Sequence, residues 1–425
     1  MLHRWKIFSL TIESEGVFQD HYQEKQDSNL SDTKSNEQFA QSINYLKEEI
    51  LKLLVVFIPF IIAIMINRAF IPFIMLVTYK KRLFDPIDER KIHRRIIPRL
   101  GGVSFAPVQC LLLVITMTLV FKANLVNIDV QSWAFLSHFM MLVCGLVILS
   151  MVGIGDDLIG VNYKWKFVTQ ILVASLLPLS GLWINDLYGL GFIVKIPFWI
   201  GMPLTVFVIV LIINAINLID GLDGLCSGLV GVSCLVLGSL FVFYGAWVHA
   251  LFAFITLGVL IPFFYYNVFG TKKRRRQIFM GDTGSMTLGF SVAFLAISLA
   301  MNNQYIKPFS EGALVVAFST LIIPVFDVAR VMLVRWRLGN PIFKPDRNHL
   351  HHKFLRAGMT HRTAMISIIG LALFFSIFNI VLVEYVNNNA VFILDIVMWV
   401  VFHLIFNRLE KRKVIERVQL YINLL

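Results

Sequence analysis

The sequence predicts an all-helical, polytopic membrane protein built as a bundle of about eleven transmembrane helices. Of the 425 residues, 57% are hydrophobic and only 15% are charged, and the mean hydropathy is +0.75. Soluble domains are typically about 45 to 50% apolar and about 25% charged. The apolar segments show neither strand-like alternation nor a repeat of fixed period, which indicates helices.

Each predicted span has about 20 mostly apolar residues, the length that crosses a bilayer at 1.5 Å rise per residue. The eleven segments cover approximately residues 53–78, 101–121, 133–152, 167–184, 202–218, 225–244, 247–269, 285–301, 312–334, 364–384 and 390–406. We therefore expect a polar amino-terminal extension (1–50), a transmembrane domain (51–407) and a basic cytoplasmic tail (408–425).

The amino-terminal extension differs in composition from the rest of the chain. Its first fifty residues hold five Lys or Arg against nine Asp or Glu and contain no apolar core. A cleavable secretory signal is therefore not expected. The extension is predicted to be flexible or interfacial, unless an upstream start codon has been wrongly chosen.

The distribution of basic residues predicts the orientation of the spans. If the chain enters from outside, the inward loops and tail hold 27 Lys or Arg, and the outward loops hold three, Lys122, Lys195 and Lys307. Basic residues concentrate on the cytoplasmic side of membrane proteins. The net charge of +12 then describes a face suited to anionic lipid and anionic substrates, and no nucleic-acid partner is expected.

Four polar motifs fall at the inward ends of these spans. "GIGDDLIGVNYKWK" follows the third, "NLIDGLDGL" the fifth, "FMGDTGS" opens the eighth, and "DRNHLHHKF" lies after the ninth. A charged side chain at the bilayer centre costs about 2.5 to 3.5 kcal/mol even on the lenient insertion scale. The acidic residues should therefore share a wet, cation-compensated mouth. They are Asp156, Asp157, Asp220, Asp223 and Asp282.

Each motif taken alone has a structural explanation. Asp-Gly pairs are ordinary turn chemistry, and Asp282 could simply cap a helix. The adjacent Asp156 and Asp157 fit this explanation less well, because they repel each other unless a metal ion, Lys or Arg lies close. The location of all four motifs at one membrane face favours a shared site.

The histidine motif also has alternatives. His349, His351 and His352 could lie in a solvated loop or bind zinc, but no cysteine accompanies them and the flanking basic residues would repel a cation. Three imidazoles among Arg347, Lys353 and Arg356 instead favour an anion site. Carboxylates that bind Mg²⁺ or Mn²⁺, together with a loop that binds phosphate oxygens, indicate phosphoryl transfer on a diphosphate. The bilayer implies that one reactant is a lipid.

Together with "PRLGG" at residues 98–102, these motifs resemble the polyprenyl-phosphate N-acetylhexosamine-1-phosphate transferases, over about residues 53–407. The loop "PDRNHLHHKFLRAGMTHR" resembles the undecaprenyl-phosphate N-acetylglucosaminyl 1-phosphate transferase branch. The phospho-N-acetylmuramoyl-pentapeptide transferases of peptidoglycan synthesis are the alternative branch. They typically have three successive histidines and a glutamate where this chain has His-Leu-His-His-Lys.

The resemblance implies a reaction in which a UDP-N-acetylhexosamine and polyprenyl phosphate give polyprenyl diphosphate-sugar and UMP. Mg²⁺ would be the cofactor, with Mn²⁺ as an alternative. This would be the initiating step of a cell-envelope glycan such as lipopolysaccharide O-antigen, in the bacterial inner membrane with the active site toward the cytoplasm. Association of two copies as a homodimer is a further expectation.

The resemblance also implies roles for individual residues. Asp282 would bind the metal ion, with Asn217 completing its shell. Asp156, beside Asp157, would deprotonate or orient the lipid phosphate, although an aspartyl nucleophile is also proposed for the family. Asp220 and Asp223 would line the nucleotide side as part of the catalytic set, with Asp223 at uracil. The diphosphate and the leaving UMP would be held by Lys166, Arg347, His349, His351 and His352.

Other protein classes stay open at this point. A secondary transporter would also have about eleven spans, but its charges should lie near the midplane on broken helices, in two matching halves. A scaffold would not need the carboxylates. The CDP-alcohol phosphotransferases, the nearest rival enzymes, have an Ala-Arg pair that "DGLDGL" lacks.

Overall fold

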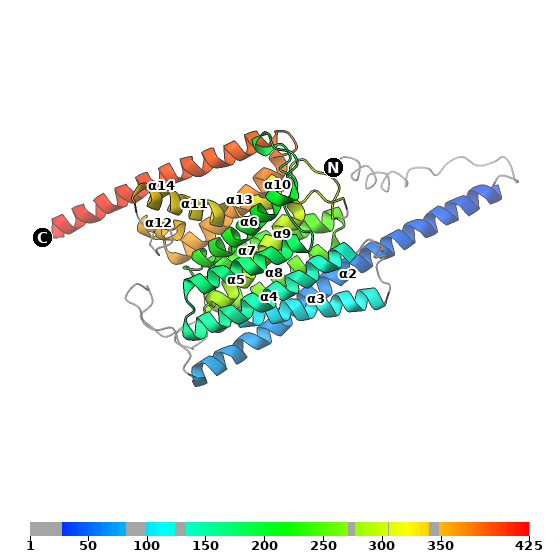
Figure 1. The fold of residues 1–425 in the computed structure, drawn as a ribbon, viewed down its shortest axis with the longest axis horizontal. Helices are drawn as coiled ribbons and strands as arrows, with labels where there is room; N and C mark the ends of the chain where they lie inside the picture. The colour runs from blue at the N-terminus through cyan, green and yellow to red at the C-terminus, as the bar shows by residue number, and fades with distance from the viewer. Residues whose placement is uncertain are drawn as a thin grey trace. The chain divides into compact units, whose positions relative to one another are not determined.

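The computed structural model describes residues 28–81, 99–123, 133–270, 277–304, 306–339 and 348–424, and these residues form helices and connecting turns without a β-strand. Figure 1 shows the helices of residues 52–425 packed side by side. In chain order they are α2 (Ser28–Lys81), η2 (Leu100–Ser104), α3 (Phe105–Lys122), α4 (Trp133–Ile159), α5 (Tyr163–Leu179), η4 (Leu190–Phe192), α6 (Phe198–Ile219), α7 (Leu225–Tyr244), α8 (Trp247–Phe269), α9 (Gly281–Ala300), α10 (Ala313–Ser319), α11 (Ile322–Arg337), α12 (Leu350–Arg356), α13 (His361–Leu382) and α14 (Asn388–Leu424).

The chain divides into two compact units, unit 1 (Met1–Leu51) and unit 2 (Lys52–Leu425). The described part of unit 1 is helical from Ser28 onward, and nearly all of its residues from 41 to 51 are exposed. Unit 2 contains every predicted span and every described motif residue. Helix α2 thus begins 25 residues before the predicted span at 53–78. The polar residues from Ser28 onward belong to the same helix as the apolar span.

Among the described helices, nine are long and apolar enough to cross a membrane, and the bent pair α10 and α11 makes a tenth. Helix α5, with 17 residues, accounts for the remaining predicted segment. The all-helical, polytopic class is confirmed. Helices α7 and α8 have the predicted bounds, because Gly224 and Gly245 adopt left-handed conformations, with φ of +78° and +76°, where α7 begins and ends.

The ninth predicted span, 312–334, is not a straight helix. It breaks between α10 and α11, whose axes differ by 80°. Pro324 lies in the first turn of α11. Because proline has no backbone N–H and its ring clashes with the carbonyl four residues earlier, Thr320, it prevents α10 from continuing as one helix. The expectation of a single rod was wrong here.

Helix α9 forms the centre of unit 2, and its residues from Thr283 to Ala300 are all buried. Glycines let its neighbours approach closely. A Cβ on Gly289 would lie 2.7 Å from the Cα of Ile213 on α6, and a Cβ on Gly153 of α4 would overlap the backbone of Thr283. These contacts bring the ends of α4 and α6 to the start of α9, where the acidic motifs lie.

Candidate functional site

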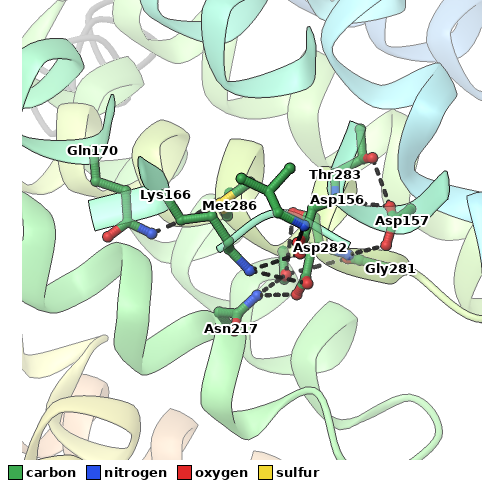
Figure 2. Close-up of polar contacts among 11 residues, drawn as sticks. Asp156, Asp157, Lys166, Gln170, Asn217, Gly281, Asp282, Thr283 and Met286 are labelled. Atoms are coloured by element: carbon green, nitrogen blue, oxygen red, sulfur yellow. Dashed lines mark hydrogen bonds and ion pairs between the residues drawn. The ribbon is translucent and has the colours of Figure 1, made fainter. Parts of the chain in front are cut away.

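The ammonium group of Lys166 joins two of the acidic motifs. Its Nζ donates to Oδ2 of Asp156 at 2.8 Å and to Oδ2 of Asp282 at 3.0 Å. Figure 2 shows these side chains converging from α4, α5 and α9. Asp156 and Asp282 therefore share one ammonium group, an arrangement in which the cation compensates the repulsion between the two carboxylates.

Asp157 holds the amino-terminal end of α9. Its carboxylate accepts hydrogen bonds from the backbone N–H of Asp282 at 2.8 Å, and from the backbone N–H and hydroxyl of Thr283 at 3.0 and 2.6 Å. A Cβ on Gly281 would lie 2.5 Å from Oδ2 of Asp157, so this contact needs glycine. Asp157 thereby orients Asp282, and its predicted catalytic role stays a prediction.

Asn217, in the last turn of α6, contacts the carboxylate of Asp282. Its Nδ2 donates to Oδ1 of Asp282 at 2.6 Å and to Oγ of Ser285 at 2.8 Å. The two residues predicted to bind a metal ion are therefore adjacent (Figure 2). Asn217 thus connects Asp282 of α9 to the "DGLDG" turn, which follows Asn217 in the chain.

The "DGLDG" turn follows α6 directly and carries Asp220 and Asp223. Burial, followed by the negative charges of Asp282, Asp223 and Asp157, raises the pKa of Asp220 well above its usual range. Asp223 accepts a hydrogen bond from Nε2 of Gln277 at 2.9 Å. The carboxylate of Asp220 is therefore influenced by three other carboxylates, and the positive charge of Arg99 acts in the opposite direction.

The histidine motif packs against this turn from α12. A Cβ on Gly221 would lie 2.7 Å from Nε2 of His351, so the imidazole lies directly on the glycine. His351 is 2% exposed, and neither of its ring nitrogens has a hydrogen-bond partner among the described residues. Burial, then the neighbouring His352 and His349, lower the pKa of His351 to about 3.

The site contains oxygen ligands suited to Mg²⁺. Asp156 and Asp282 both contact the ammonium group of Lys166, and Asn217 contacts Asp282, whereas no group of three His, Cys, Asp or Glu with metal-binding geometry occurs in the described ranges. Mg²⁺ characteristically takes one or two carboxylates and completes its octahedral shell with water and substrate phosphates. The two carboxylates and one amide therefore fit this ion.

The structure thus brings together nearly all the predicted residues. Asp156, Asp157, Lys166, Asn217 and Asp282 form one hydrogen-bonded cluster, with Asp220 coupled to it electrostatically. His351 contacts the adjacent turn, and His349 and His352 flank its ring. Arg347 lies outside the described residues.

Sequence reasoning missed two site residues. Asp327 on α11 contacts His349, and Gln277 contacts Asp223. A signal existed for Asp327, because a carboxylate inside the apolar segment "IIPVFDVARV" needs a nearby partner. Gln277 precedes the "FMGDTGS" motif without any distinguishing pattern.

Comparison with known proteins assigns the family. The model of glycosyl transferase family 4 matches residues 139–300. A Yersinia pestis protein named undecaprenyl-phosphate alpha-N-acetylglucosaminyl 1-phosphate transferase is 31% identical over 78% of this chain and 84% of its own length. A protein of the same name from Escherichia coli K12 is 31% identical over 84% of this chain and 90% of its own length. The chain belongs to glycosyl transferase family 4.

The family 4 match and the relatives together confirm the resemblance that the motifs indicated, and the names of the relatives support the branch. The matched stretch, 139–300, holds the five acidic residues, Lys166 and Asn217. The histidine motif lies beyond it. Its place in the site depends on the contact between His351 and Gly221.

Proposed function

We propose that the chain transfers N-acetylglucosamine 1-phosphate from UDP-N-acetylglucosamine to undecaprenyl phosphate, with UMP as the second product. The observation that carries this proposal is the contact of the imidazole motif with the "DGLDG" turn beside the cluster of Asp156, Lys166 and Asp282. One site then offers groups for a cation and groups for phosphate oxygens. The printed names of the relatives support the sugar and the lipid.

In the proposed reaction, an oxygen of the lipid phosphate forms a bond to the sugar-bearing phosphorus of the UDP-sugar. The bond from that phosphorus to the bridging oxygen breaks, and UMP leaves. A phosphate monoester has a second pKa of about 6 and is largely a dianion at neutral pH. The acceptor therefore needs positioning and charge neutralisation more than a strong base.

The engagement of the aspartates favours direct transfer over a covalent aspartyl intermediate. Oδ1 of Asp156 accepts the backbone N–H of Val161 at 2.7 Å, and Oδ2 accepts Lys166. Both oxygens of Asp157 are bound at the start of α9. Because these hydrogen bonds withdraw charge from the carboxylate oxygens, they lower the nucleophilicity of both groups.

Bound at Asp156, Asp282 and Asn217, Mg²⁺ would neutralise the charge of the diphosphate oxygens. Lys166 keeps the two carboxylates together and offers an ammonium donor to phosphate. His349, His351 and His352, with Arg347, would hold the departing UMP, and Asp223 with Gln277 would face the nucleotide.

An apolar cavity of about 230 Å³ offers a place for part of the polyprenyl chain. Its walls come from the segment between α5 and α6 and from α6, α10, α11 and α14, and they include Leu211, Ile212 and Phe318. Ile212 precedes Asn217 by five residues, about 7.5 Å along a helix. A lipid tail in this cavity could thus keep its phosphate near the carboxylates.

The orientation and location are part of the proposal. The inward loops and tail hold 27 basic residues and the outward loops three, which supports a cytoplasmic site. The bacterial relatives support the inner membrane. The proposed product would begin a cell-envelope glycan.

Purified protein incubated with undecaprenyl phosphate and a panel of UDP-sugars tests the proposal. Lipid-linked product and UMP should form together with UDP-N-acetylglucosamine, and chelation of Mg²⁺ should abolish both. Product from another UDP-sugar only would refute the sugar assignment. Flux of UDP-sugar into liposomes without product would favour a transporter.

A further inference from the structure

Asp327 is a buried carboxylate that the proposed reaction does not yet use. It lies on α11, is 2% exposed, and places Oδ2 3.0 Å from Nδ1 of His349. Both of its oxygens also lie 3.1 Å from the backbone N–H of Leu350. A single carboxylate on α11 thus holds the start of the histidine motif.

Arg330 completes this attachment. Its Nη2 donates to Oδ1 of Asp327 at 2.7 Å and to the carbonyl oxygen of Asn348. Two side chains of α11 therefore contact three successive residues. Arg330 binds the carbonyl oxygen of Asn348, and Asp327 binds the side chain of His349 and the backbone N–H of Leu350. The arginine also compensates the buried negative charge, which would otherwise be costly.

The contact with Asp327 determines which nitrogen of His349 can serve a ligand. An ionised carboxylate only accepts hydrogen bonds, so Nδ1 of His349 must carry a proton. Nε2 is then the ring nitrogen left to meet a ligand. A carboxylate behind a working imidazole is a recurrent way to fix its tautomer and its orientation.

A chain of contacts connects this pair to the site. The rings of His349 and His351 lie nearly parallel, with an interplanar angle of 5° and centroids 6.2 Å apart, and His351 lies on Gly221. A change in the orientation of His349 would therefore alter the imidazole row beside the "DGLDG" turn.

We propose that Asp327 is a positioning residue for the transfer reaction and acts through His349. It holds the imidazole with Nδ1 protonated and Nε2 directed to the phosphate groups of the UDP-sugar. This inference rests on the proposed function for the identity of that ligand. The simpler alternative is that Asp327 only anchors α12, in which case its effect should not depend on the imidazole.

A double-mutant cycle distinguishes the two roles. Asp327→Asn removes the charge and offers His349 an amide of the same size. We expect it to lower kcat/KM for UDP-N-acetylglucosamine by about 10- to 100-fold, the range typical of a lost partner behind a functional histidine. The KM for undecaprenyl phosphate should change less than about twofold, and in a His349→Ala background the same substitution should cost less than about twofold.

Asp186→Asn is the matched control. Asp186 is also 2% exposed and accepts hydrogen bonds from Tyr188 and Asn302, but it is not part of the proposed site. Its variant should retain the wild-type kcat/KM. If Asp327→Asn fails to fold, as judged by gel filtration and Tm, Asp327→Glu takes its place in the cycle, because it keeps the charge but displaces it by one methylene.

Equal losses from the Asp327 substitution with and without the His349 imidazole would overturn the proposal, as would wild-type kinetics in Asp327→Asn. The same cycle can be measured as the Kd of UDP by calorimetry. An inactive wild-type protein would refute the proposed function, and the UDP cycle would still support or overturn the pairing of Asp327 with His349.

Discussion

At the scale of single residues, Lys166 holds the acidic cluster together. It is the ammonium group within 3.0 Å of both Asp156 and Asp282, and those carboxylates come from helices far apart in sequence. The sequence could predict these three residues because each belongs to a recognisable motif. It could not predict that Asp157 would bind the start of α9, since that depends on how α4 and α9 pack.

Lys166→Met should abolish this compensation. We expect at least a 100-fold lower rate of transfer, comparable to the loss of a preorganised charge in other active sites, and a lower Tm in chelator that Mg²⁺ partly restores. Lys164→Met is the control, because Lys164 is exposed two residues earlier. Similar kinetics and Tm in both variants would contradict the role of Lys166.

His351 predicts a pH dependence of stability. Its pKa of about 3 in the folded protein lies below the ordinary 6.5, so the unfolded chain binds more protons between these values. The contribution of the neutral imidazole to the free energy of unfolding is complete above pH 6.5. It is lost as the pH falls toward 3, by up to about 1.4 kcal/mol per pH unit.

The Tm of the wild type should therefore fall more steeply between pH 7 and pH 5 than that of His351→Gln, in the same detergent. Parallel Tm profiles would show that the imidazole is not buried in its neutral form.

At the scale of elements, the close approach of α4 to α9 places the acidic groups. The sequence predicted both helices, and Gly153 lies directly after the predicted span 133–152. The sequence did not reveal that this glycine faces Thr283. Likewise, the 80° break before α11 was not recognised in the predicted span 312–334, although Pro324 marks it in retrospect.

Gly153→Ala should separate α4 from α9, because its Cβ would overlap the backbone of Thr283. We expect about 1 to 3 kcal/mol of destabilisation from overpacking and at least a tenfold loss of transfer, as Asp157 moves away from Thr283. Denaturation midpoints and UMP release would measure the two effects.

Gly155→Ala provides the comparison on the same helix. The nearest atom to its Cβ would be 3.8 Å away, on Val161, so this variant should keep its stability. Equal effects at the two positions would exclude close packing as the cause.

At the scale of the whole molecule, composition and the basic-residue count predicted a polytopic helical protein with one polar face. In unit 2, side chains from α4, α5, α6 and α9 meet in one cluster. The sequence marked Asp327 as a carboxylate that needs a partner, but it could not show that this partner is His349. It gave no signal for Gln277, which meets Asp223 only on folding.

The orientation is testable by labelling single cysteines in a background without the four native ones. In right-side-out vesicles, a membrane-impermeant maleimide should label Phe192→Cys, at a position that is 95% exposed between α5 and α6. Lys164→Cys should react only after permeabilisation. The reverse pattern would place the acidic cluster outside.

The most direct test of the central claim is UMP release by Asp282→Asn beside Asp186→Asn, with Mg²⁺, UDP-N-acetylglucosamine and undecaprenyl phosphate. We predict that Asp186→Asn and the wild type release UMP only when the lipid phosphate is present, and that Asp282→Asn is at least 100-fold slower, a loss typical of removing a preorganised catalytic charge. Near-normal release by a folded Asp282→Asn variant would contradict the account.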